Sequence, residues 1–164
     1  KGTDPSEVFG AHTDTSFVTI IPVAAVSGLE IYDEDAEEWY RPELAAKRHW
    51  EDLHGTAMQV DDEGLPWHAR YVAMLPGELL QVVTRNEVAS AVHRVVAGGS
   101  SIRHSAPVLL RGRPGTTLDV PTYLGEVNTD MLETVAGEPL QEIYRLLQPS
   151  ANQQRPPRSE DQQE

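Results

Sequence analysis

Short stretches of alternating apolar and polar residues, separated by Gly and Pro, run through most of the chain. Such alternation is typical of strands that are buried on one face. Strands are predicted at residues 12–22, 28–32, 39–42, 71–84 (two segments divided by a Pro-Gly turn), 90–96, 102–110 and 116–123. Many short strands and little helix indicate a mainly β fold, either a sandwich or a barrel.

Two regions depart from the strand pattern. Residues 44–69 form an insert, in which a short amphipathic helix is expected over 44–53. After the last strand, the spacing of apolar residues predicts a helical segment within 126–148, and the Gln-, Pro- and Ser-rich residues 149–164 predict a disordered tail. The expected organisation is one β core over 1–125, which carries the insert, then the helical segment and the tail.

Composition narrows the function classes. The chain has 164 residues, enough for one domain with a real core, and 13 Lys and Arg against 26 Asp and Glu give a net charge of −13. A nucleic-acid or anionic-membrane surface would need basic patches, so both are disfavoured. No cysteine is present, which excludes disulfides and zinc-thiolate sites and fits a cytoplasmic protein. The longest apolar run, Phe17 to Val26, is about half the length of a membrane-spanning helix.

Acidic residues cluster between Glu30 and Glu43, where seven acids accompany a single Arg. A solvated loop is the expected explanation, and cation binding is the lesser alternative.

The first candidate for chemistry is a His-x-Asp pair, His12 and Asp14, at the start of the first apolar run. Side chains two residues apart on a strand point to the same face. With a distant second His they would complete a 2-His-1-carboxylate set, which suits non-haem Fe(II) because coordination positions stay open. Taken alone, such a pair is more often a hydrogen-bonded surface contact.

The second His and a further motif follow downstream. His93 begins a His-Arg-Val run, and ten residues later Arg103 and Ser105 form an Arg-x-Ser motif on another predicted strand. A guanidinium beside a hydroxyl is a suitable clamp for a small carboxylate, because Arg binds carboxylates bidentately and stays charged. Each motif alone is weak, but the ordered set is specific.

In this ordered set the chain resembles the Fe(II)/2-oxoglutarate-dependent dioxygenases, in particular the isopenicillin N synthase-like branch. The resemblance runs from about residue 9 to 119 and includes Ala11 to Thr15, Ser27 to Tyr32, Pro76 to Gln81, His93 to Val95 and Arg103 to Ser105. It implies a double-stranded β-helix, or jelly roll.

The resemblance also implies roles for five residues. Iron is expected on His12, Asp14 and His93. Arg103 and Ser105 are expected to bind the distal carboxylate of 2-oxoglutarate. No catalytic residue beyond the metal site is predicted.

The implied activity is the oxidation of a small organic molecule, by hydroxylation or desaturation, with 2-oxoglutarate and O2 consumed and succinate and CO2 released. Some members of the branch keep Arg-x-Ser without using 2-oxoglutarate, so an iron oxidase independent of this cosubstrate is the first alternative. A non-catalytic jelly-roll binding module and a zinc hydrolase with the same ligands are the others.

The resemblance also raises the question of what precedes this chain. Members of the branch usually carry a long region before the first metal motif, whereas Lys1 lies only eleven residues before His12. We therefore expect the missing N-terminal half of the same protein as a partner. The insert at 44–69 is expected to act as a lid or to contact that half.

Overall fold

The computed structural model describes residues 7–84, 86–97, 101–117 and 137–145. The elements in chain order are β1 (Glu7–His12), β2 (Val18–Pro22), β3 (Leu29–Asp33), β4 (Glu38–Tyr40), α1 (Pro42–His54), the 3-10 helix η1 (Trp67–Arg70), β5 (Val72–Pro76), α2 (Glu78–Val83), β6 (His93–Val96) and β7 (Val108–Leu110). The expected mainly β class, with few helices, is confirmed for the described residues.

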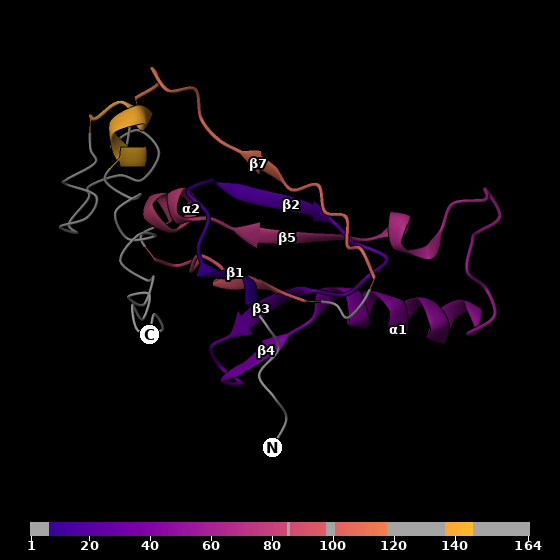
Figure 1. The fold of residues 1–164 in the computed structure, drawn as a ribbon. Coiled ribbons are helices and arrows are strands. Elements are labelled where there is room, and N and C mark those ends of the chain that lie inside the picture. The colour runs from indigo at the N-terminus through magenta and orange to yellow at the C-terminus, as the bar shows by residue number, and fades with distance from the viewer. Residues whose placement is uncertain (1–6, 85, 98–100, 118–136, 146–164) are drawn as a thin grey trace, which may run out of the picture.

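Two antiparallel sheets carry the fold, one above the other in Figure 1. One has the strand order β1-β6-β3-β4, and the other has the order β5-β2-β7. In the first sheet His12 pairs with His93, so the two sequence motifs meet on neighbouring strands. The β1–β6 register shifts twice before it reaches this pair, which bends the end of β1.

The core between the sheets comes from residues that alternate inward. Ile21, Leu29 and Leu75 are buried together, one from each of β2, β3 and β5. Their neighbours along the strands point outward, as the period of two requires. The sheets are thereby held face to face, with the metal motifs at one side of the first sheet.

The insert contains a longer helix than expected. Pro42 occupies the first turn of α1, and Gly55, with a φ of 82°, follows its last residue. Trp50 of α1 and Trp67 of η1 pack with Val23 in one buried apolar cluster. Figure 1 shows α1 and η1 at one end of the sheets and α2 at the opposite end.

Three strand predictions were wrong. The predicted strand 12–22 is divided between β1 and β2 by residues 13–17, so Asp14 lies in a loop. Residues 78–83 form α2 instead of a strand. Residues 102–106 adopt no regular structure, and the strand β7 begins only at Val108.

Other expectations fall outside the described residues. They include the strand residues 118–123, most of the helical segment 126–148 and the tail 149–164. Residues 140–145 are helical, in agreement with the prediction for that segment. Among the described helices, none combines the length and apolarity required to span a membrane.

The outward face of the β5-β2-β7 sheet is apolar. Its most exposed side chains are Ile20, Val72, Met74, Val108 and Leu110, which are 37–63% accessible. Apolar residues on both faces of a sheet are typical of sheets that are covered on both sides.

Candidate functional site

The two His residues and the Asp of the sequence motifs come together. One potential ligand atom from each of His12, Asp14 and His93 lies within 4.8 Å of the others. Nε2 of His12 lies 3.7 Å from Asp14 Oδ1, and Nε2 of His93 lies 3.8 Å from Asp14 Oδ2. Among the described residues, this is the one group of His and acidic side chains spaced to hold a metal ion.

Both imidazoles are oriented through the backbone. Nδ1 of His12 donates to the carbonyl of Gly10 at 2.9 Å, and Nδ1 of His93 donates to the carbonyl of Ala91 at 3.0 Å. A carbonyl only accepts, so in the neutral imidazole each Nδ1 carries the proton and each Nε2 has the lone pair. The lone pairs face Asp14, as a metal-binding imidazole requires.

Asp14 is held from two directions. The Thr19 hydroxyl, which is buried, donates to Asp14 Oδ2 at 2.5 Å. The loop itself is held by the first turn of α2, where the Glu78 N–H donates to the Asp14 carbonyl at 2.8 Å. The first N–H groups of a helix lack partners within that helix, so the loop satisfies them while it is fixed in place.

Burial shifts two pKa values beside this group. Burial lowers the pKa of His93, although the Ala91 carbonyl and Asp14 oppose the shift and His12 adds to it. The neutral form that binds metals is therefore favoured at neutral pH. Burial also raises the pKa of Glu78, helped by the charge of Asp14 and opposed by a 2.6 Å hydrogen bond from Thr13.

Arg103 and Ser105 line the same cavity as the triad, with a volume of about 250 Å³. They do so from the irregular segment 102–106, so the prediction that they share a strand face was wrong. The Arg103 side chain is 12% accessible and pairs with Glu43 at 2.8 Å. Ser105 is exposed.

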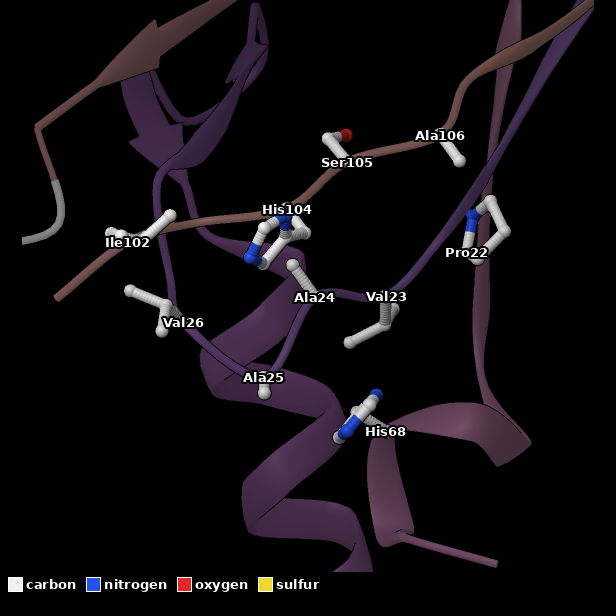
Figure 2. A pocket seen from close by; sticks show the side chains of 10 residues that line it. All are labelled: Pro22, Val23, Ala24, Ala25, Val26, His68, Ile102, His104, Ser105 and Ala106. Carbon is white, nitrogen blue, oxygen red and sulfur yellow. The ribbon is translucent and has the colours of Figure 1, made fainter.

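A second cavity, of about 290 Å³, lies on the far side of Ser105. Figure 2 shows the segment with Ile102 to Ala106 crossing the loop of residues 22–26, with His68 approaching from η1. Its lining is mostly aliphatic, and it holds none of the three candidate metal ligands.

The expectation of a solvated acidic loop was wrong for two of its residues. Glu30 and Glu43 are buried, at 4% and 3% accessibility. Glu30 accepts hydrogen bonds from Arg41 and Arg94, at 2.8 and 2.7 Å. The acids between β3 and β4 are exposed, as expected.

Sequence reasoning missed several residues that support the site. Thr19 and Glu43 lie five and twenty-nine positions after Asp14 and belong to no motif. Thr19 carried one usable signal, because a polar residue on the inward face of an apolar strand needs a buried partner. The carbonyls of Gly10 and Ala91 carry no sequence signal at all.

Known proteins resemble this chain in sequence and in structure. No protein-family model matches the chain. A feruloyl CoA ortho-hydroxylase from Ipomoea batatas is 26% identical over 109 residues, which are 66% of this chain and 24% of the relative. The chain thus spans about a quarter of the length of that relative.

Solved structures share the fold. The dioxygenase for auxin oxidation from rice aligns with a TM-score of 0.56 and 18% identity, over 89% of this chain and 42% of that one. A putative oxygenase from Shewanella oneidensis aligns at 0.53 and 16%, over 92% and 44%. The dioxygenase for auxin oxidation 1 from Arabidopsis thaliana, in complex with 2-oxoglutarate, aligns at 0.50 and 19%, over 69% and 34%. The resemblance to Fe(II)/2-oxoglutarate dioxygenases is confirmed.

Proposed function

We propose that this chain is the metal-binding part of a non-haem Fe(II)- and 2-oxoglutarate-dependent dioxygenase. It would hydroxylate or desaturate a small organic substrate, with O2 consumed and succinate and CO2 released. The observation that carries the proposal is the convergence of His12, Asp14 and His93, with both Nε2 lone pairs turned toward the carboxylate.

The donor set fits Fe(II). Two neutral imidazoles and one carboxylate leave a divalent ion with one residual positive charge and open coordination positions. Bound there, iron and 2-oxoglutarate would together supply the oxidising power that protein side chains lack. The metal ligands are therefore proposed to be His12, Asp14 and His93.

The protein's own contribution is position and charge. Arg103, on the wall of the triad cavity, would bind the distal carboxylate of 2-oxoglutarate, because it is the partly buried cation that lines that cavity. Ser105 would add a hydroxyl donor from the same segment. Apolar lining from Ile21 and Leu29 would limit access of water to the metal.

Anaerobic titration tests this proposal. Fe(II) is added to the chain without oxygen, then 2-oxoglutarate, and the weak visible charge-transfer band of an Fe(II)–2-oxo acid chelate is recorded. The band is expected with the unmodified chain. The His93→Ala variant is expected to lose tightly bound iron and, with it, the band.

The alternatives give different results in the same titration. In Arg103→Ala, iron should stay bound while the 2-oxoglutarate concentration needed for the band rises steeply. Iron binding without a band would favour the cosubstrate-independent oxidase. An unmodified chain that binds no iron would contradict the proposal and favour a non-catalytic module.

Three finer expectations accompany the proposal. The two facing sheets would form a double-stranded β-helix. An N-terminal half of the same protein would cover the apolar outer face of the β5-β2-β7 sheet. The exposure of that face supports the expectation of such a partner. A cytoplasmic location stays a prediction.

A further inference from the structure

Arg103 is held by an acidic residue that no motif contains. Glu43 Oε1 accepts from Arg103 Nη2 at 2.8 Å and lies 3.3 Å from Nε. The same oxygen accepts from the backbone N–H of Leu29 at 3.2 Å. One carboxylate oxygen thus joins the start of α1, the start of β3 and the segment with Arg103.

Glu43 does not occupy all donors of the guanidinium. Arg has five N–H groups in a planar fork, and Glu43 engages one on Nε and one on Nη2. Three have no partner among the described residues, two on Nη1 and one on Nη2. They lie along the end of the fork, which is the edge that binds a carboxylate bidentately.

Gly28 contributes a second constraint on Arg103. A Cβ at this position would lie 2.7 Å from Arg103 Cδ and 2.9 Å from the carbonyl oxygen of Val96. The Arg103 stem therefore crosses the backbone directly at Gly28. Glu43 binds one edge of the guanidinium, and Gly28 lies against the aliphatic part of the Arg103 side chain. Together these contacts hold the guanidinium in one orientation.

We propose that Glu43 is a positioning residue for Arg103, and that the helix α1 serves the cosubstrate site through its first turn. By holding the Nε edge, Glu43 turns the other edge of the guanidinium toward the distal carboxylate of a 2-oxo diacid. This inference rests on the proposed function, because it concerns the same cavity.

The position of Glu43 gives the helix α1 a role that a lid does not require. Glu43 lies in the first turn of α1, and Trp50 anchors that helix through its own apolar cluster. The helix is thus fixed independently of the clamp. Burial of both partners makes the contact costly to break, because either would be left as an unpaired buried charge.

The test compares two ligands on the Fe(II)-loaded chain under anaerobic conditions. 2-Oxoglutarate has the distal carboxylate that Arg103 would bind, whereas 2-oxobutyrate binds iron through its 2-oxo acid group alone. Glu43→Ala should weaken 2-oxoglutarate binding about tenfold, the cost of losing a well-oriented charged hydrogen bond. Binding of 2-oxobutyrate should change by less than about twofold.

Two further variants separate positioning from charge. Glu43→Gln keeps an acceptor oxygen for Arg103 and Leu29 but removes the negative charge, so it should retain most of the affinity for 2-oxoglutarate. Glu30→Gln is the matched control, because Glu30 is equally buried but pairs with Arg41 and Arg94. It should change neither ligand's affinity. If Glu43→Ala does not fold, Gly28→Ala applies the same test by displacing the Arg103 stem.

The outcomes distinguish this inference from the function on which it rests. Equal weakening of both ligands in Glu43→Ala, or no change in either, would overturn the positioning role while the dioxygenase proposal stands. An unmodified chain that binds iron but neither 2-oxo acid would overturn the cosubstrate assignment and the inference together. Selective loss of 2-oxoglutarate, recovered in Glu43→Gln, is the expected result.

Discussion

Each proposed metal ligand is oriented by an atom outside the set of three residues. His12 and His93 depend on backbone carbonyls, which substitution does not remove, whereas Asp14 depends on the hydroxyl of Thr19. Such supporting contacts orient the ligand and raise its affinity for metal. Substitution of Thr19 is therefore the direct test of these supporting contacts.

Thr19→Val is expected to weaken Fe(II) binding about tenfold to a hundredfold, because Val keeps the shape but removes the donor to Asp14. Competition with a chelator of known affinity measures the change. Thr13→Val is the control, since the Thr13 hydroxyl donates to Glu78 instead of a ligand. Equal affinity in Thr19→Val and the unmodified chain would show that Asp14 needs no such orientation.

The grouping of the three proposed ligands could be predicted from the sequence, whereas the contacts that support them could not. His12, Asp14 and His93 carry motif signatures, and the structure brings them together although Asp14 lies in a loop and not on the predicted strand. Glu43, like Glu30, lies in an acidic run whose other members are exposed, so composition favoured the solvated explanation. A single long-range contact with Arg103 decides its burial, and no local pattern encodes that contact.

At the scale of elements, α2 shows why local pattern was insufficient. Its residues are mostly apolar and include a Val-Val pair, which favours a strand. The preceding Gly77 approaches Ser16 so closely that a Cβ would lie 2.1 Å from the Ser16 carbonyl oxygen. The loop of residues 14–17 accepts hydrogen bonds from the start of the helix. Tertiary contact with that loop thus overrides the strand preference.

Glu30 links elements by charge, since it joins β3 to Arg94 of β6 and to Arg41 before α1. Burial acts to raise the pKa of Glu30, but hydrogen bonds from Arg94 and Arg41 outweigh it and hold the pKa below the usual value of 4.5. The folded state then binds fewer protons than the unfolded state. This stabilisation is present above the unfolded pKa and is lost as the pH falls through the folded pKa.

Glu30→Gln is accordingly expected to lower the free energy of unfolding by about 2 kcal/mol at neutral pH. The difference from the unmodified chain should shrink below about pH 4.5, where Glu30 begins to be protonated in the unfolded state. Urea denaturation at several pH values measures this. A difference that stays constant down to about pH 3 would contradict the role of the Glu30 charge.

The helix α1 is expected to depend on one aromatic side chain. Trp50 is buried at 4% accessibility, and its Nε1 donates to the Met58 carbonyl at 2.7 Å. Trp50→Ala should lower the free energy of unfolding by about 3–5 kcal/mol, because it leaves a cavity and an unpaired carbonyl. Leu53→Ala on the exposed side of α1 should cost less than about 0.5 kcal/mol. Equal effects of the two variants in thermal denaturation would contradict the packing of this helix.

For the whole molecule, the apolar outer face of the β5-β2-β7 sheet governs behaviour in solution. The chain alone is expected to bind an apolar fluorescent dye, because contiguous exposed apolar patches of this kind are uncommon on monomers. The double variant Met74→Glu, Val108→Lys should reduce dye fluorescence and self-association. Arg145→Glu, at an exposed position outside this sheet, serves as the control for a charge change elsewhere. Unchanged dye binding in the double variant would assign the signal to a different surface.

The pairing of His12 with His93 has a consequence for the rate at which a bound metal would be released. The two proposed ligands come from neighbouring strands. In the part of the chain that the structure describes, β1 is an edge strand that pairs with β6 alone. A terminal strand of this kind detaches more readily than an inner one. Each detachment would carry His12 away from the other two ligands. The residence time of a bound metal would then be limited by how often β1 opens, and the metal would in turn slow amide hydrogen exchange along β1.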